Sequence, residues 1–230
     1  MPTKGKPHIR HTAVAQEVYR YLRDAVCAGD AFKPGERINV DQIALDWNVS
    51  KTPVREALKA LEQDGVIKYV PRRGFFVTVL DLAELRDILD VRIALEVHAL
   101  EHGFEVIDRN KIRSFAGEFQ RTFQILNDNG DAARYLDVDA RFHSLIIQAS
   151  ANHKMIEIYE NMQGAMRYLR YRDTFATEAA MGNSMPEHTT VIDAILRNER
   201  DKAVLALKTH LKNVEERLVE INHALEQAAS

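Results

Sequence analysis

One amphipathic segment, which begins at Ser50, constrains the fold of this chain more than any other part of the sequence. Its apolar residues recur at the spacing of one helix face and are Val54, Ala57, Leu58 and Leu61. Ser50 or Thr52 can cap this predicted helix, and Pro53 falls in its first turn, where a missing N–H costs nothing. The exposed start of the helix combines Lys51, Thr52 and Arg55 with unpaired backbone donors, which suits phosphates and base edges. A helix that is merely solvated on its basic side is the plain alternative.

The residues before this segment predict a helix-turn-helix. Asn39 can cap a preceding helix, and Gln42 lies three residues later, as in a capping box. Asn48 tolerates the left-handed backbone of a tight turn, after which the Ser50 helix begins. A further helix is predicted upstream, from Thr12 to Gly29.

Two short strands are predicted after Gly65, over residues 66–70 and 75–79, because β-branched and aromatic residues dominate both. The turn between them is Pro71-Arg72-Arg73-Gly74. A hairpin with two arginines at its tip can act as a wing that touches the DNA backbone or enters the minor groove. A solvated turn is the alternative, but the position of the hairpin directly after a helix-turn-helix favours a wing.

Composition narrows the class of protein without naming a function. The 230 residues are 46% hydrophobic and 28% charged, as in an ordinary globular protein, and Cys27 is the only cysteine, so no internal disulfide is expected. The sequence shows no signal peptide and no apolar run of roughly 18 residues, so we expect a cytoplasmic protein without a membrane span. Lys and Arg outnumber Asp and Glu by thirteen to nine through Thr78, whereas acidic residues prevail by twenty-five to eighteen in the remainder. This asymmetry predicts that the first domain, residues 1–79, meets phosphates.

Three motifs in this first domain resemble the DNA-binding domain of GntR-family transcription regulators. They are Phe32 to Arg37, Val49 to Leu58, and Pro71 to Val77. The resemblance implies a winged helix-turn-helix, and the DNA contacts that it implies are Arg37, Lys51, Thr52, Arg55, Arg72, Arg73 and Gly74. The chain departs from the family pattern at Lys51, where relatives usually carry arginine. A lysine cannot form the same two-donor fork to guanine, so the base preference at this step is not carried over.

The second domain, residues 80–230, is predicted to be an antiparallel all-helical bundle, because no strand pattern follows Val79. We expect six helices in it, over residues 81–102, 108–129, 131–150, 154–180, 187–198 and 201–226. The predicted fold class is therefore mainly α, with a winged helix-turn-helix and a small β-hairpin at the N-terminus and the helical bundle at the C-terminus.

Four polar residues fall on apolar faces of these predicted helices, where an unpaired charge is costly. Asp139 and His143 stand four residues apart and share a face, while His188 and His210 lie in apolar stripes of their own. A single histidine on an apolar face is more often a hydrogen-bonded core residue. Four such groups together favour a shared divalent metal ion, which relieves the burial of all of them. Three nitrogens and one oxygen suit Zn²⁺, with Ni²⁺ and Mn²⁺ as alternatives.

The bundle also resembles the C-terminal ligand-binding domain of the FadR-like branch of GntR regulators. The motifs that carry this resemblance are Arg92 to Glu96, Asp139 to His143, Glu187-His188 and Thr209-His210-Leu211. Metal-containing members of the branch use the aspartate and the three histidines that match Asp139, His143, His188 and His210. The expected six-helix bundle favours the VanR-like subgroup. Arg92 matches the family's usual arginine for a ligand carboxylate, with a salt bridge to Glu96 as an equal alternative.

The sequence as a whole predicts a homodimeric transcription regulator, and not an enzyme, that binds an inverted-repeat operator in double-stranded DNA. Its bundle is expected to bind a small carboxylate effector at the metal. Repression relieved by this effector is the expected mode, with activation as the alternative. The alternative is a hydrolase or lyase with a metal centre, fused to a DNA-binding domain, but no HExxH, nucleophile-elbow or phosphate-loop motif is present. A regulator with an acyl-chain ligand and no metal is disfavoured by the four polar groups in the core.

Overall fold

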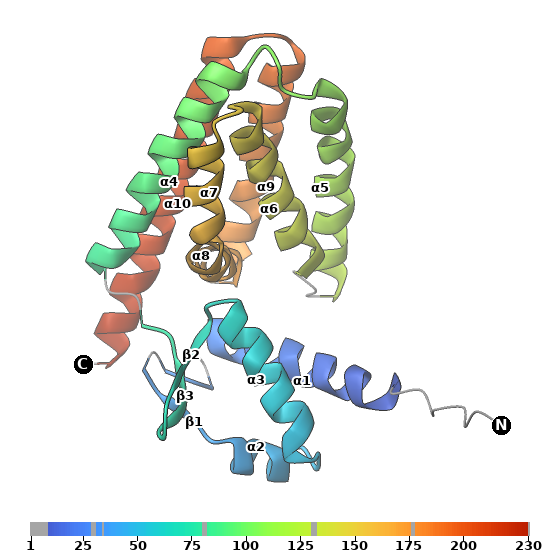
Figure 1. Cartoon of the computed structure of the whole chain (residues 1–230), viewed down its shortest axis with the longest axis vertical. Helices are drawn as coiled ribbons and strands as arrows, with labels where there is room; N and C mark the ends of the chain where they lie inside the picture. Colours follow the sequence, from blue (N-terminus) through green and yellow to red (C-terminus); the bar gives the residue numbers. More distant parts are fainter. Residues whose placement is uncertain are drawn as a thin grey trace, which may run out of the picture. The chain divides into compact units, whose positions relative to one another are not determined.

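The computed structural model of the chain describes residues 9–28, 31–33, 35–79, 82–129, 133–175 and 178–229. The chain divides into two compact units, Met1–Val79 and Leu80–Ser230 (Figure 1). Helices dominate both units. No described helix combines the length and the apolar character that a membrane span requires.

The N-terminal unit folds as a winged helix-turn-helix. Its elements in chain order are α1 (Ile9–Ala28), β1 (Arg37–Ile38), α2 (Val40–Asp46), α3 (Lys51–Gln63), β2 (Ile67–Val70) and β3 (Gly74–Val77). Helix α3 is the predicted amphipathic segment, and all four residues of its apolar stripe are buried. This helix packs against α1, where Val18, Leu22 and Val26 are buried as well. Burial of one face therefore holds the unit together and leaves the other face of α3 exposed.

The small sheet has three strands rather than the two of the predicted hairpin. Its order is β1-β3-β2, and both strand pairs are antiparallel. Strand β1 pairs Arg37 with Phe76 and Ile38 with Phe75, so it extends the hairpin by one edge strand. A strand of two residues is too short to show the alternation from which strands are predicted.

The turns follow the predicted chemistry with two exceptions. Asn39 caps α2, because its side chain accepts hydrogen bonds from two backbone N–H groups in the first turn. Asn48 has a positive φ of 52°, as the tight turn between α2 and α3 requires. The capping box does not close, since the Gln42 side chain donates to Asp46 instead of reaching back to the cap. Ser50 has the extended backbone of an N-cap residue but makes no side-chain capping bond.

The described residues of the C-terminal unit form seven helices, so the predicted count of six is wrong. They are α4 (Leu82–Gly103), α5 (Arg109–Asn129), α6 (Ala133–Ala149), α7 (His153–Asn161), α8 (Gln163–Phe175), α9 (Glu178–Leu196) and α10 (Arg200–Ala229). The long helix predicted over residues 154–180 breaks at Met162, which separates α7 from α8. One glycine, Gly164, lies two residues after the break, but an isolated glycine in a helical pattern is only a weak signal for a break. The six-helix argument for the VanR-like subgroup therefore does not hold.

Helix α9 begins earlier than predicted, because it runs through Pro186 rather than starting after it. Proline lacks an N–H and removes one backbone hydrogen bond from a helix interior. The residues that follow compensate by burial, since Val191, Ile192 and Ile195 are at most 1% exposed. Tertiary packing thus overrides the local signal from which a helix start was predicted.

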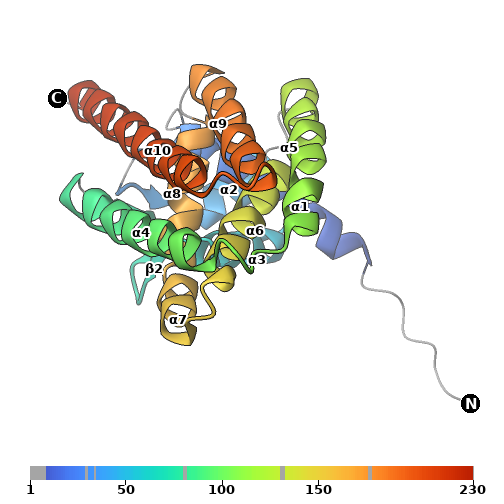
Figure 2. The same cartoon turned by 90° about the horizontal axis from the view of Figure 1, so that it is seen from above.

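The long helices of this unit pack side by side around an apolar core. Helix α10 lies against α4 and α9, while α6 lies against α4 and α5 (Figure 2). Helices α4 and α6 approach each other closely at Gly103, where a Cβ atom would lie 2.4 Å from the backbone of Ala149. Space, rather than backbone conformation, therefore requires glycine at this crossing.

Substitution of Gly103 by alanine should destabilise the C-terminal unit by about 1–3 kcal/mol, because backbone atoms block the new methyl group. Gly164→Ala is the matched control, since Gly164 lies in α8 with no neighbouring atom within 4 Å of the new Cβ position. This control should stabilise the helix by roughly 0.5–1 kcal/mol. Urea unfolding of both variants measures the two effects, and equal stability would contradict the close approach of α4 and α6.

Candidate metal centre and nucleic-acid interface

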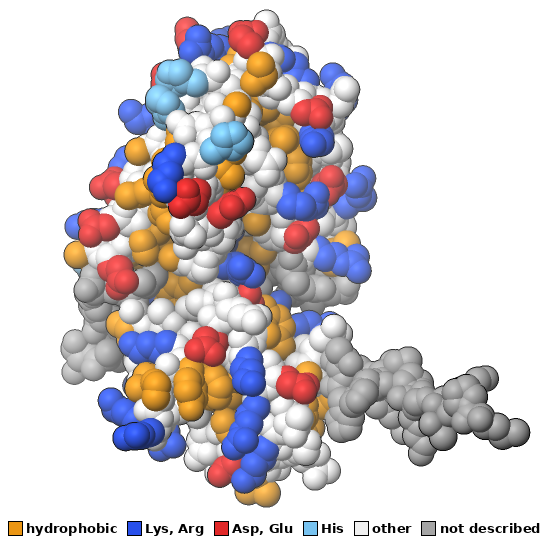
Figure 3. All heavy atoms as spheres, in the orientation of Figure 1, with side chains coloured by type: hydrophobic (Ala, Val, Ile, Leu, Met, Phe, Trp, Pro, Cys, Tyr) orange, Lys and Arg blue, Asp and Glu red, His pale blue; other side chains and the backbone are white. Residues whose placement is uncertain are grey.

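The first candidate site is an open groove of the N-terminal unit, bordered by the start of α2, helix α3 and the turn between β2 and β3. Its volume is about 610 Å³. Five of the seven predicted DNA contacts line it, namely Arg37, Arg55, Arg72, Arg73 and Gly74. Figure 3 shows Lys and Arg side chains on both sides of an apolar strip on this unit. Lys59 also lines the groove but was not among the predicted DNA contacts. With the four arginines it makes five cations in the lining, against two carboxylates. The groove is thus net positive, as phosphate binding requires.

The turn at the rim of the groove depends on backbone conformations that few residues adopt. Arg72 and Gly74 have positive φ angles of 64° and 99°. A Cβ atom at Gly74 would lie 3.7 Å from Arg37 Nε, which places the Arg37 guanidinium beside the turn. Arg73 lies over the ring of Phe76 at 5.3 Å from its centroid. The three predicted arginines of the wing region are therefore held close to one another by β1 and β3.

The other two predicted DNA contacts, Lys51 and Thr52, are exposed at the start of α3 but do not line the groove. Lys51 forms an exposed ion pair with Asp41, with 2.8 Å between Nζ and Oδ1. The hydrogen bond from Lys51 and its positive charge lower the pKa of Asp41. Because both side chains are solvent-exposed, the lysine can exchange this carboxylate for a phosphate at little cost.

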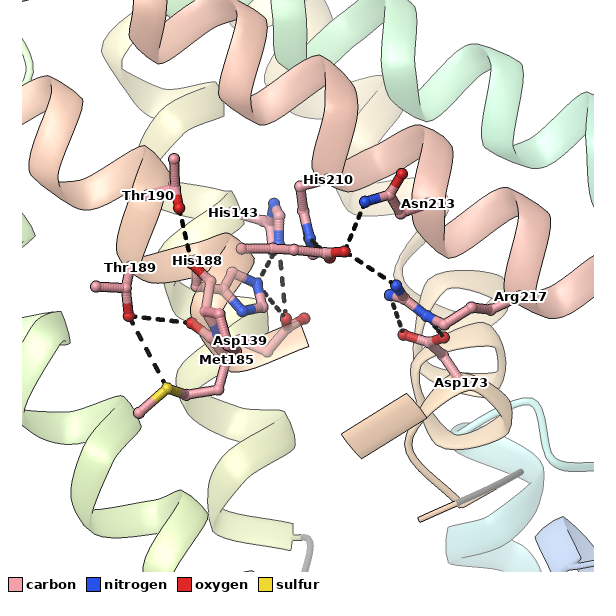
Figure 4. Close-up of polar contacts among 12 residues, drawn as sticks. Asp139, His143, Asp173, Met185, His188, Thr189, Thr190, His210, Asn213 and Arg217 are labelled. Atoms are coloured by element: carbon pink, nitrogen blue, oxygen red, sulfur yellow. Dashed lines mark hydrogen bonds and ion pairs between the residues drawn. The ribbon is translucent and has the colours of Figure 1, made fainter. Parts of the chain in front are cut away.

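The second candidate site lies in the C-terminal unit, where the four predicted metal ligands come together. Asp139 and His143 come from α6, His188 from α9 and His210 from α10, and all four are buried. Asp139 Oδ1 lies 3.0 Å from His188 Nε2 and 3.6 Å from His143 Nε2, and these two nitrogens are 3.3 Å apart. One ring nitrogen from each of the three histidines lies within 4.8 Å of the others. Figure 4 shows the four side chains converging from their helices.

Two glutamates orient the histidines, a role that was not predicted from the sequence motifs that contain them. Glu96 Oε2 accepts a hydrogen bond from His143 Nδ1 at 2.5 Å, and Glu187 Oε2 accepts one from His210 Nδ1 at 2.8 Å. A carboxylate can only accept, so Nδ1 of each ring carries a proton, and in the neutral form of the ring Nε2 then has the lone pair that a metal ion needs. This carboxylate–histidine arrangement is typical of metal ligands in proteins. His188 differs, because its Nδ1 has no hydrogen-bond partner among the described residues.

The ionisation states at the centre are those that metal ligands need. Burial lowers the pKa of His188, and burial together with the neighbouring His188 lowers the pKa of His210 to about 3. Burial alone would raise the pKa of Asp139, but its contacts with His143, His188 and Arg170 hold it well below the usual value. Near neutral pH the site therefore offers neutral imidazoles from His188 and His210 and a charged carboxylate.

These residues fit a divalent metal ion. His210 Nε2 is buried and has no hydrogen-bond partner among the described residues, although it lies beside His188 and His143. A buried ring nitrogen without a partner is costly unless something accepts its lone pair. The four residues would supply three nitrogens and one oxygen, and the metal would act there as a Lewis acid that anchors an anionic ligand.

A small pocket, which is partly open to solvent, adjoins the centre. Its volume is about 20 Å³, and its lining includes Arg92, Tyr135, Asp139, Arg170 and His210. Arg92 Nε lies 2.8 Å from Glu96 Oε1, so the predicted ligand arginine forms the salt bridge that the sequence left as the alternative.

Arg170, on α8, was not singled out in the sequence. It lies 2.6 Å from Asp139 through its Nε atom and donates from Nη2 to the hydroxyl of Tyr159 at 3.2 Å. No local pattern could have found it, because its partners lie on α6 and α7, and because the helix break at Met162 changes its register.

Comparison with known proteins matches both units to bacterial regulators. The family model "Bacterial regulatory proteins, gntR family" matches residues 14–77, and the FCD domain model matches residues 87–213. The HTH-type transcriptional regulator YdhC of Bacillus subtilis is 26% identical over 92% of this chain and 92% of that protein. The HTH-type transcriptional repressor RspR of Escherichia coli is 23% identical over 90% of each chain.

Solved structures give the same fold. A GntR transcriptional regulator from Rhodococcus sp. RHA1 superposes with a TM-score of 0.59 at 21% identity, over 90% of this chain and 98% of that one. The metal-free FCD domain of the transcriptional regulator TM0439 covers 64% of this chain and 99% of its own, with a TM-score of 0.54 at 27% identity. The matched families and relatives are transcription regulators, and the chain is not an enzyme. It belongs to the GntR family of bacterial transcription regulators and carries an FCD domain after its DNA-binding domain.

Proposed function

We propose that this regulator is a metabolite-responsive repressor whose FCD domain binds a small organic acid at a divalent metal ion. Residues 1–79 bind a double-stranded operator in the cytoplasm, and residues 80–230 bind the metal and the effector. The observation that carries the proposal is the buried centre of Asp139, His143, His188 and His210, next to a small pocket that two arginines line.

The metal assignment follows from the ligand set and its surroundings. Three imidazoles and one carboxylate suit Zn²⁺, and Ni²⁺ and Mn²⁺ accept the same ligands. Glu96 and Glu187 fix two of the imidazoles in the required tautomer. These two glutamates contact Nδ1 of the histidines and not the centre itself. They therefore leave the metal ion free to hold a further ligand.

The ligand class follows from the charges around the cavity. Arg92 and Arg170 both line it, and a metal ion would add further positive charge. An anion with oxygen donors, such as a carboxylate, matches both the arginines and the metal. At about 20 Å³ the cavity has room for about one water molecule, so an organic acid requires a more open arrangement of the helices. A ligand that binds one arrangement better than the other is what allosteric control requires.

Operator binding as a homodimer follows from the helix-turn-helix. One recognition helix covers one half-site, and two copies related by two-fold symmetry read an inverted repeat. Repression is supported by the related repressor RspR. A metalloenzyme is not favoured, since Glu96 and Glu187 hold histidines and Asp173 is held by Arg217, which leaves none of these three as a general base.

Arg55→Ala should weaken binding to an operator selected from random DNA by about 1–3 kcal/mol, because Arg55 is the exposed arginine of α3 in the groove. Arg86→Ala, which changes an exposed arginine of α4, is the control and should leave the affinity unchanged. Fluorescence anisotropy at two salt concentrations measures the affinity and its expected steep salt dependence. A variant without both Arg55 and Arg72 that binds as tightly as the wild type would refute this interface.

His188→Ala and His210→Ala should each lose most of the bound metal, because each removes one of four ligands from a buried centre. Elemental analysis of protein purified without added metal or chelator gives the occupancy. His102→Ala is the control, since His102 is exposed on α4 away from the centre. Full occupancy in both His188→Ala and His210→Ala would rule out the four-ligand site.

One acid from a panel of hydroxy, keto and dicarboxylic acids should bind the metal-loaded protein with an affinity that operator DNA changes by roughly 5–150-fold. Linkage requires this effect to be reciprocal, so the same acid must change operator affinity by the same factor. Calorimetric titration with and without operator measures it. If every acid that binds does so equally well in both conditions, the metal has only a structural role and control lies elsewhere.

A further inference from the structure

The two arginines of the cavity have different kinds of partner. Arg92 contacts Glu96, whose second oxygen holds His143 through Nδ1. Arg170 contacts Oδ2 of Asp139, whose other oxygen faces the ring nitrogens of the centre. Both arginines are at most 5% exposed, so each depends on its carboxylate for charge compensation.

A metal ion at the centre would leave one of these pairs intact and change the other. His143 would bind the metal through Nε2 and keep Nδ1 on Glu96, so the carboxylate of Glu96 stays with Arg92. Asp139 is itself a proposed ligand, so the metal ion would neutralise part of the negative charge of its carboxylate. Asp139 is also the only carboxylate that contacts Arg170 among the described residues. Metal binding at Oδ1 would therefore weaken the charge compensation of Arg170, whose contact is with Oδ2 of the same carboxylate, and not that of Arg92.

Arg170 also has unused hydrogen-bonding capacity. Its Nη2 donates to Tyr159, but its Nη1 is buried without a partner among the described residues. Its Nε lies close to Asp139 without the alignment of a hydrogen bond. The hydroxyl of Tyr135, on the same cavity, likewise has no aligned partner. A buried guanidinium with an unfilled donor is suited to a carboxylate, which accepts from two N–H groups at once.

We infer that Arg170 is the residue that binds the carboxylate of the ligand, and that Asp139 neutralises Arg170 until a metal ion takes the aspartate. The inference rests on the proposed metal and carboxylate binding of this domain and adds the order in which they act. Without metal, an anion has to displace Asp139 from Arg170. With metal, the anion compensates the charge that the metal has exposed, so metal and anion bind with positive coupling.

The test compares Zn²⁺ binding to metal-free wild type, Arg170→Gln and Arg170→Lys, each with and without sodium acetate, by calorimetry. Arg170→Gln should bind Zn²⁺ more tightly than the wild type, by on the order of tenfold, because it removes the cation that competes for Asp139. Acetate should tighten Zn²⁺ binding to the wild type and leave Arg170→Gln unaffected. Arg167→Gln, which changes an exposed arginine of the same helix, is the control and should behave as the wild type in both respects.

Two results would overturn the inference. Weaker Zn²⁺ binding by Arg170→Gln would mean that Arg170 merely positions Asp139 as a metal ligand. Equal effects of acetate, or none, on the wild type and Arg170→Gln would mean that Arg170 does not bind the anion. Weak binding of acetate to free Zn²⁺ is the same for every variant and cancels in the comparison. Wild type that binds no Zn²⁺ at all would instead refute the proposed metal site, and the inference with it.

Arg170→Lys keeps the test decisive if Arg170→Gln does not fold. Lysine retains the charge but lacks the planar fork. We therefore expect Zn²⁺ affinity close to the wild type and a smaller effect of acetate. Undiminished acetate coupling in Arg170→Lys, with Arg170→Gln unfolded, would contradict the role of the guanidinium.

Discussion

Compensation of buried charge is the constraint on which the C-terminal unit depends. A charged side chain in a helical core is stable only beside a partner, and here the partners belong to different helices. Asp139 of α6 pairs with Arg170 of α8, and Asp173 of α8 accepts hydrogen bonds from Nε and Nη2 of Arg217 on α10. Glu187 of α9 also accepts from Arg217. These contacts are electrostatic as well as steric, so the packing of α6, α8, α9 and α10 depends on the charge at the centre.

Helix α8 is the element whose packing depends most on the charge at the centre. It carries Arg170 and Asp173 three residues apart, so both lie on one side of the helix and reach different neighbours. The break at Met162 separates this helix from α7, which allows α8 to shift without moving α7 as a rigid extension. If Asp139 binds a metal ion, as proposed, the ion pair between Asp173 and Arg217 would remain as a charged link from α8 to the rest of the bundle. An effect at the metal can thus become a change in helix packing.

Much of the fold could be predicted because local periodicity reports which face of a helix is buried. The stripe of α3, the cap at Asn39 and the left-handed Asn48 all lie within a few residues of the features that they control. The convergence of Asp139, His143, His188 and His210 was predictable for the same reason, since they are polar residues on apolar stripes. The strand β1 and the contact of Arg170 with Asp139 were not, because each depends on residues far away in the chain. The break at Met162 was missed because an isolated glycine nearby is a weak signal. A salt bridge within one helix, such as that of Arg92 with Glu96, could be named from the sequence. The sequence could not decide between this salt bridge and a contact of Arg92 with the ligand.

The size of the pocket limits how an organic acid could control this protein. With room for about one water molecule in the arrangement described, the proposed binding of an acid of several heavy atoms would select a more open one. The apparent affinity would then be the intrinsic affinity reduced by the fraction of open molecules. Each tenfold decrease in the fraction of open molecules weakens the apparent free energy of binding by about 1.4 kcal/mol. This loss is inseparable from the response, because an acid that fitted both arrangements equally well would bind more tightly and yet change nothing at the operator.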